Sequence, residues 1–344
     1  MAVLAALVAT VPAAVALQGR GWRMRHRMVG LLAGVTLLAT AAIGASTVLS
    51  APAAHAAYPG ANGRIAFEQG GVIYSIRPDG SDRRQLTTNT ASHSPRWSPN
   101  GRLLAFHRAG DIWTMKPDGS AAHRVTSGSA NDINPSWSPD GSRLVFSRTT
   151  TGTLAGRSLY VVAAAGGAAH LLTTRSDGCA VEPTWSATGR YVVYWDKCAS
   201  GVTAGGNALR KVNTTTGAIT TVVGVAGLST PEGQFFAIDT GPDVTPDGSH
   251  VVFTAAHGQP SGNYCIAITD LSGGGFRCLS IEYESGVFLA DDPAVSPDGT
   301  LVVYTTGNEN PQLDVITTSG SDQCCNAIYS GIDFPLRPDW QPRP

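Results

Sequence analysis

One five-residue motif recurs between residues 97 and 299 and limits what the chain can fold into. Its consensus is Trp-Ser-Pro-Asp-Gly, and its copies are Trp97–Gly101, Trp137–Gly141, Trp185–Gly189, Val244–Gly248 and Val295–Gly299. Successive copies lie 40 to 59 residues apart, the length of a supersecondary unit of four strands. The motif therefore predicts one large repeat domain of about six units rather than unrelated domains.

The chemistry of the motif predicts a hairpin turn. Proline presets φ for the turn, Asp or Asn tolerates the next position, and glycine accepts the positive φ at which the strands rejoin. Alternating strand-like segments follow, as at Arg102–Phe106, Arg143–Phe146 and Leu301–Tyr304. We expect the Trp or Val that opens each copy to pack between adjacent units.

A second turn follows each first turn, and the count of turns predicts a closed ring. The six second turns are Pro78–Gly80, Pro117–Gly119, Gly166–Gly167, Thr216–Gly217, Gly273–Gly274 and Ser319–Gly320. The missing first turn is supplied by the termini: Trp340–Pro342 matches the strand before the turn, and Asn62–Phe67 matches the turn exit and the strand after it. We predict an all-β, six-bladed β-propeller of four-stranded blades, closed by the C-terminal strand joining the N-terminal blade. The alternative for evenly spaced short strands is a two-sheet sandwich.

The full repeat also resembles a known family. Its pattern is x-Pro-x-Trp-Ser-Pro-Asp-Gly-x-x-Leu-x-Phe, then Asp-Ile-Trp/Tyr before the second turn, then a strand ending in Leu-Thr, as at Leu86-Thr87. This pattern resembles the WD40-like propeller repeat of the TolB-like family, from about residue 58 to 344. The chain leaves no room for the separate N-terminal α/β domain of that family, so partner contacts made through that domain are not expected.

The N-terminus predicts export. Arg23, Arg25 and Arg27 form a basic region, Val29–Leu49 is apolar, and Ala54–Ala56 supplies a small-x-small cleavage site. We expect residues 1–56 to be a signal peptide and residues 57–344 to be the propeller. Val29–Leu49 is long enough for the alternative, a membrane anchor. Because an upstream apolar stretch, Met1–Leu17, is not needed for a signal, the start is better placed at Met24 or Met28, unless the stretch is an extra helix.

The charge balance limits the class of partner, and the cysteines indicate the redox state of the compartment. Residues 57–344 hold 20 basic and 25 acidic side chains without a basic stripe, which argues against nucleic-acid binding. The six cysteines of an exported chain should be mostly oxidised. Cys179 and Cys198 flank one hairpin, and Cys265 and Cys278 flank another, so we predict these two disulfides. Cys324 and Cys325 are left for a strained vicinal bond or for free thiols.

The resemblance places a candidate site at one mouth of the central channel. The strand before each first turn is innermost in the resembling fold, so residues three to five before the motif Trp or Val should lie near that mouth. These residues are His93, Ser94, Asp132, Asn134, Glu182, Asp239, Asp291 and Asp292, with Asp333 at the start of the final strand. Such a ring could attract a cationic group, a metal ion or a basic peptide. Alternatively, the carboxylates cap turns and are solvated.

No catalytic motif is present. The chain has no Gly-x-Ser-x-Gly elbow, His-Glu-x-x-His helix or P-loop. Some propellers resembling this one are lyases with a histidine-bound metal, but only His93 falls on a predicted channel position, and one imidazole is a poor metal site. The segments Lys197–Asn207, Gly224–Asp239 and His257–Asn263 are the longest insertions and the expected recognition loops.

These observations predict a secreted, non-catalytic binding module of the cell envelope or secretome. We expect it to engage a protein or glycan, to need no cofactor, to be a monomer and to insert in no membrane after signal cleavage. The alternative is a channel-metal polysaccharide lyase or lactone hydrolase.

Overall fold

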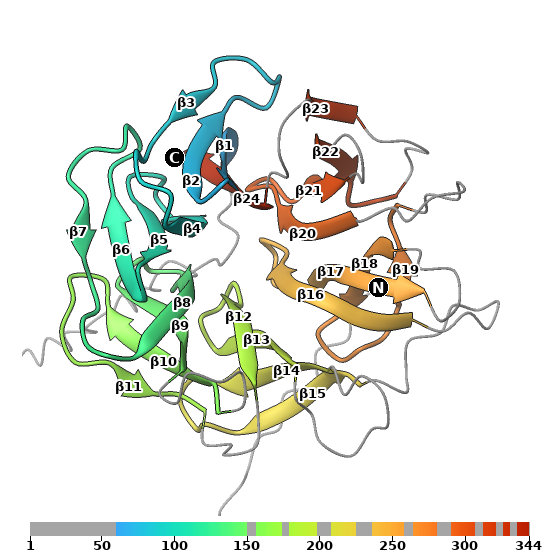
Figure 1. Ribbon diagram of the computed structural model, residues 1–344. Coiled ribbons are helices and arrows are strands. Elements are labelled where there is room, and N and C mark those ends of the chain that lie inside the picture. Colours follow the sequence, from blue (N-terminus) through green and yellow to red (C-terminus); the bar gives the residue numbers. More distant parts are fainter. Residues whose placement is uncertain are drawn as a thin grey trace, which may run out of the picture. The chain divides into compact units, whose positions relative to one another are not determined.

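The computed structural model describes ten segments of the chain, all within one compact unit that runs from Ser50 to Pro344. They are residues 60–149, 156–173, 179–197, 208–224, 236–257, 264–280, 290–306, 312–320, 326–330 and 336–343. The described residues form six four-stranded antiparallel sheets, and they contain no helix (Figure 1). The sheets follow one another around a ring as the six blades.

The first three blades are built from strands β1 to β11 and the last strand, β24. Blade 1 is β24 (Leu336–Arg343), β1 (Ala61–Gln69), β2 (Val72–Ile76) and β3 (Arg84–Gln85). Blade 2 is β4 (Ser92–Trp97), β5 (Leu104–Arg108), β6 (Asp111–Met115) and β7 (His123–Arg124). Blade 3 is β8 (Asn131–Trp137), β9 (Arg143–Thr149), β10 (Ser158–Ala163) and β11 (His170–Leu171).

The other three blades follow in chain order. Blade 4 is β12 (Ala180–Trp185), β13 (Tyr191–Asp196), β14 (Ala208–Asn213) and β15 (Ile219–Val223). Blade 5 is β16 (Phe236–Val244), β17 (His250–His257), β18 (Tyr264–Asp270) and β19 (Arg277–Cys278). Blade 6 is β20 (Ala290–Val295), β21 (Leu301–Thr306), β22 (Gln312–Thr317) and β23 (Asn326–Ser330).

The ring is closed, as predicted, by the last strand. β24 pairs antiparallel with β1, with Trp340 opposite Ile65 and Asp339 opposite Ala66. The red end of the chain therefore lies beside the blue first blade in Figure 1. Each innermost strand also contacts the next one around the ring, in the order β24, β4, β8, β12, β16, β20 and back to β24.

The recurring motif forms the turn between the first and second strands of its blade. In all five internal copies the glycine N–H donates to the carbonyl of the first turn residue at 2.8 Å, as from Gly101 to Ser98. The Asn or Asp side chain accepts a backbone N–H two residues on, as Asn100 does from Arg102. In blade 4 the Thr188 hydroxyl takes this acceptor role for Arg190.

The Trp or Val that opens each motif packs between blades, as predicted. The buried apolar residues of the described segments form six clusters, and each cluster joins two consecutive blades. Trp97 packs on Ala66 and Ile73 of blade 1, and Trp340 packs on Ala294 and Val303 of blade 6. The hydrophobic core is therefore a chain of interfaces that closes on itself.

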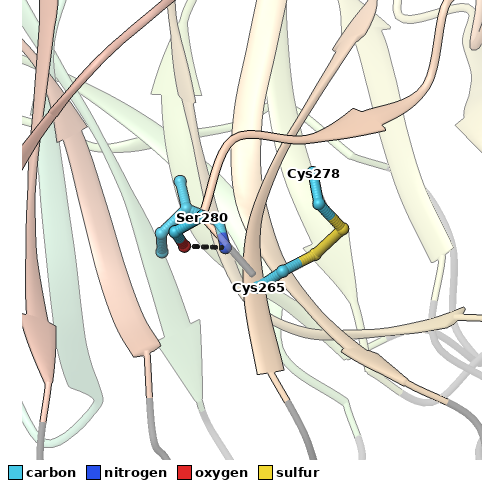
Figure 2. Close-up of a disulfide and its surroundings, with 4 residues drawn as sticks. Cys265, Cys278 and Ser280 are labelled. Atoms are coloured by element: carbon cyan, nitrogen blue, oxygen red, sulfur yellow. Dashed lines mark hydrogen bonds between the residues drawn. A yellow bond between two sulfur atoms is a disulfide. The ribbon is translucent and has the colours of Figure 1, made fainter. Parts of the chain in front are cut away.

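One of the two predicted disulfides is present. Cys265 on β18 is bonded to Cys278 on β19, with Cα atoms 5.7 Å apart (Figure 2). Cys278 faces Ala267 in the register, so the bond runs diagonally between positions on the same face. Beside it, the N–H of Ile266 donates to the Ser280 hydroxyl at 3.2 Å (Figure 2).

The second predicted pair lies at the edge of the described chain. Cys179 is disulfide-bonded, and its carbonyl accepts the N–H of Lys197 at 3.2 Å, which brings it opposite the residue before Cys198. Cys198, Cys324 and Cys325 lie outside the described residues, so the pairing of Cys179 with Cys198 stays a prediction.

No helix within the described segments has the length and apolar character needed to cross a membrane.

Closure makes a testable prediction about Trp340, which is 3% exposed in the interface between blades 6 and 1. Replacing Trp340 by Ala removes a buried indole and should lower the free energy of unfolding by about 3 to 5 kcal/mol. The control is Leu103→Ala, because Leu103 is 36% exposed and should cost far less. Denaturant unfolding followed by tryptophan fluorescence measures both variants. Equal stability of Trp340→Ala and the unmodified protein would contradict closure by β24.

Candidate functional site

Each innermost strand carries a β-bulge at the same place. The bulged residue precedes a proline in all six blades: Ser94-Pro95, Asn134-Pro135, Glu182-Pro183, Gly241-Pro242, Asp292-Pro293 and Arg337-Pro338. The strand register shifts across each of these pairs. Proline has no N–H for the ladder, which explains why pairing breaks there. The five non-glycine bulge residues have φ between 50° and 54°, a region that costs free energy for any residue with a side chain.

The bulges divide the channel lining into two levels. We call the end of the channel where the innermost strands begin the upper end. The upper ring is the six bulge residues Ser94, Asn134, Glu182, Gly241, Asp292 and Arg337, which line one hollow. The lower ring is the residues that follow the prolines, of which Arg96, Ser136, Thr184, Asp243 and Asp339 line a second hollow. The hollows measure about 20 and 40 Å³, room for about one to four water molecules each.

Arg337 spans the upper ring from blade 1 to the opposite blade. Its Nη2 atom lies 2.8 Å from Oε1 of Glu182 in blade 4. Its Nη1 atom donates to the Ser94 hydroxyl at 3.0 Å, and its backbone N–H donates to Oδ2 of Asp292 at 3.2 Å. One guanidinium therefore connects side chains from blades 1, 2 and 4, and we call this contact the upper crossbar.

Arg96 makes a similar lower crossbar from blade 2. Its Nη1 atom lies 3.3 Å from Oδ1 of Asp339 in blade 1 and 4.0 Å from Oδ1 of Asp243 in the opposite blade 5. Asp243 also accepts the N–H of Val295 at 2.8 Å and the Thr184 hydroxyl at 3.2 Å. The lower crossbar thus joins groups from five of the six blades.

Burial perturbs the carboxylates of both rings. Burial, reinforced by the negative charge of Asp291, raises the pKa of Asp292 to about 8. Burial, opposed by Arg96 and reinforced by Asp243, raises the pKa of Asp339 to about 7. Burial also raises the pKa of Asp243. These directions show that the two arginines do not fully compensate the carboxylates around them.

The arginines themselves are held in the charged form. Burial works to lower the pKa of Arg337, but Glu182 and Asp292 outweigh it and keep that pKa above its ordinary value. For Arg96, Asp339 and Asp243 likewise outweigh burial and raise its pKa. Both guanidinium groups therefore stay positively charged throughout the pH range in which proteins fold.

Gly241 leaves room for the upper crossbar. A Cβ atom on Gly241 would clash with Oε2 of Glu182 and would lie 2.5 Å from its Cβ. Blade 5 thus contributes only backbone to the upper ring, and the carboxylate of Glu182 occupies the space a side chain would fill.

A histidine pair lies at the upper end beside the rings. Nδ1 of His93 is 2.6 Å from Oε1 of Glu68, and the His93 ring stacks on His107 with centroids 5.1 Å apart. Burial, with the neighbouring His93 adding to it, lowers the pKa of His107 to about 3. His107 is therefore neutral at neutral pH.

Most of the predicted site residues lie together at the upper end of the channel. Glu182 and Asp292 lie in the upper ring with Ser94 and Asn134, and His93 lies beside it. Asp291 precedes Asp292, and its Oδ1 accepts the Asp292 N–H at 2.8 Å.

Asp132 is placed differently. Both of its oxygens bind Arg148 on the neighbouring strand of blade 3, at 2.6 and 2.7 Å, and it is 1% exposed. Asp239 is described only as a backbone position of β16, and Asp333 lies outside the described residues.

The sequence analysis missed four charged residues of the two rings: Arg96, Asp243, Arg337 and Asp339. The channel was expected to be lined mainly by acids, yet each ring holds an arginine. A signal for these residues exists, because each one stands immediately before or after the proline that precedes a motif Trp or Val. The position expected for Asp333 in the sixth copy is occupied by Arg337, three residues before Trp340.

In the described part of the chain, no group of three or more His, Cys, Asp or Glu side chains is arranged to hold a metal ion. The expected recognition loops, Lys197–Asn207, Gly224–Asp239 and His257–Asn263, lie largely outside the described residues.

The comparisons with known proteins agree with this architecture. Residues 65–222, from β1 to β15, match the PD40 family, described as the TolB beta propeller domain. Among curated proteins, no sequence matches this chain. The structure defines a closed six-bladed propeller, and the family match supports the TolB-like repeat that the sequence pattern predicted, over residues 65–222.

Solved structures share the fold at low sequence identity. TolB from Acinetobacter baumannii is 20% identical with a TM-score of 0.62, covering 82% of this chain and 67% of that chain. A protein provisionally named TolB from Agrobacterium tumefaciens is 18% identical with a TM-score of 0.58, covering 79% and 91%. Kuenenia stuttgartiensis hydrazine synthase is 12% identical with a TM-score of 0.63, covering 83% and 47%. At such identities these likenesses concern the fold alone.

The close fit at Gly241 predicts how the upper crossbar responds to one methyl group. Gly241→Ala should displace Glu182 from Arg337 and lower the free energy of unfolding by about 1 to 3 kcal/mol. Gly224→Ala is the matched control, because a Cβ there meets only Thr221 at an ordinary 3.8 Å. Thermal unfolding of the two variants side by side tests this. If Gly241→Ala has the same melting temperature as Gly224→Ala, the carboxylate of Glu182 does not occupy the space beside Gly241.

Proposed function

We propose that this chain is an exported, non-catalytic binding module that engages a partner of the cell envelope at the upper mouth of its channel. The observation that carries the proposal is the upper ring, in which five of the six blades place a polar or charged side chain at the equivalent bulge. Strained backbone maintained at five positions of one channel is typical of a site rather than of a scaffold alone.

The size of the hollows favours binding at the mouth. Each ring leaves space for only a few water molecules, because Arg96 and Arg337 lie across the channel. A partner that uses this site therefore contacts the upper ring and the histidine pair from above. A protein segment or a glycan terminus has the necessary hydrogen-bonding groups.

Two features of the sequence support export and an envelope partner. The basic, apolar and small-residue regions before Ala57 are arranged as in a signal peptide. The TolB-like repeat is that of an envelope protein family, and the chain offers no hydrolase or phosphate-binding motif. Binding is therefore a better account of the propeller than catalysis.

Site-specific photo-crosslinking tests the proposal. A benzophenone amino acid replaces His93, whose side chain is 38% exposed at the channel mouth. The control carries the same group at Leu171, which is 52% exposed on an outer strand. Both proteins, secreted by the native organism, are irradiated in intact cells and analysed by mass spectrometry.

We expect one protein or glycan adduct at position 93 that is absent at position 171. Adducts of equal yield and composition at both positions, or none at position 93, would refute binding at the channel mouth. An intracellular protein that still begins near Met1 would refute export.

A further inference from the structure

The two crossbars repeat one arrangement. In the upper ring, Arg337 of blade 1 meets Glu182 of the opposite blade 4 and Asp292 of the preceding blade 6. In the lower ring, Arg96 of blade 2 meets Asp243 of the opposite blade 5 and Asp339 of the preceding blade 1. The lower triad thus has the charges of the upper triad one blade further on, although Arg337 reaches Asp292 through its backbone N–H and Arg96 reaches Asp339 through its guanidinium.

Each triad has one more carboxylate than guanidinium. With all groups ionised, each would carry a net charge of −1 in a place largely withdrawn from water. The side chains of Arg96, Asp243 and Asp339 are 25%, 12% and 15% exposed, and those of Arg337 and Glu182 are 32% and 14% exposed. An uncompensated charge in such surroundings is costly, and one bound proton removes it.

Contacts and burial together indicate which carboxylate takes the proton. In the upper triad, Glu182 receives the guanidinium directly, while Asp292 accepts a backbone N–H of Arg337 and lies next to Asp291. In the lower triad, Asp243 accepts two hydrogen bonds besides lying 4.0 Å from Arg96. Asp339 accepts Arg96 Nη1 at 3.3 Å and the Trp97 N–H, but its burial and the neighbouring Asp243 favour its protonated form.

We propose that the two triads form a proton-linked latch across the channel, in which Asp292 and Asp339 each hold a proton when the latch is closed. Their release gives each triad a net charge of −1 and weakens the contacts between opposite blades. The contacts between opposite blades are therefore strongest in mild acid and weaker in mild alkali. A protein outside the cytoplasm meets the pH of its surroundings directly.

The charged groups around Asp292 and Asp339 support the same dependence on pH. Asp292 is faced by Asp291, Arg337 and Glu182, and its pKa is raised to about 8. Asp339 is faced by Arg96 and Asp243, and its pKa is raised to about 7. Both pKa values exceed 3.8, the value in the unfolded chain. The two aspartates therefore stabilise the folded state fully below pH 3.8, and this stabilisation is lost as the pH rises to 7 for Asp339 and to 8 for Asp292.

His107 acts in the opposite sense at lower pH. Its pKa falls from 6.5 to about 3 on folding, so its contribution changes only between those values. From pH 6.5 to 8 the two aspartates therefore dominate the change in stability. Linkage predicts that the equilibrium constant for unfolding rises roughly sixtyfold across this range.

Denaturant unfolding from pH 6.5 to 8 at constant ionic strength tests the latch. Asn mimics the protonated carboxyl, so Asp292→Asn should reduce the rise to roughly fourfold and Asp339→Asn to roughly fifteenfold, and the double variant should abolish it. The control is Asp118→Asn in an exposed turn, where hydrogen bonds from Ser120 lower the carboxyl pKa. That group is ionised throughout the range, so the control should keep the full rise.

Infrared spectroscopy of the unmodified protein gives a second readout. The protonated-carboxyl band present at pH 6.5 should disappear by pH 9, and each Asn variant should lack part of it. No such band at pH 6.5 would overturn the proposal even if a variant failed to fold. An unfolding constant independent of pH in this range, or Asn variants with the full rise, would overturn it equally.

Discussion

Pairing of the last strand with the first is the interaction on which the rest of this structure depends. β24 completes blade 1 through β1 and buries Trp340 against blade 6, so it turns a row of blades into a ring. The same strand carries Arg337 and Asp339, which belong to the two crossbars. A chain without this strand would therefore lose the ring, the whole upper crossbar and the Asp339 contact of the lower crossbar.

The crossbars depend in turn on the bulges. A regular strand would alternate its side chains between the two neighbouring blades and would leave the channel to backbone atoms. The residue-proline pair interrupts this alternation and turns one side chain of each non-glycine copy toward the axis. Five residues at positive φ are unfavourable by themselves, and the contacts across the channel offset that cost. Strain in the strands and ion pairs in the channel are thus two parts of one arrangement.

The fold could be predicted because its determinants are local. Pro, Asp and Gly at fixed offsets specify the turn whatever lies elsewhere, and counting turns was enough to predict closure. The bond between Cys265 and Cys278 followed from their places on either side of one turn, since hairpin register is set by the turn.

The site was predictable only in part, because its contacts are not local. Glu182 and Arg337 are 155 residues apart and meet only because blades 1 and 4 lie opposite each other. Asp132 stands two residues before a bulge, where its side chain faces Arg148 within the sheet. The expectation for Asp132 followed sequence distance from the motif, whereas the bulge decides which side chain reaches the channel.

A double-mutant cycle between Arg337 and Glu182 tests the account most directly. The free energy of unfolding is measured for the unmodified protein, Arg337→Met, Glu182→Gln and the double variant. We predict a coupling energy of about 1 to 3 kcal/mol, because the two groups contact each other in a channel that excludes most water. A coupling energy indistinguishable from zero would mean that no crossbar joins the opposite blades.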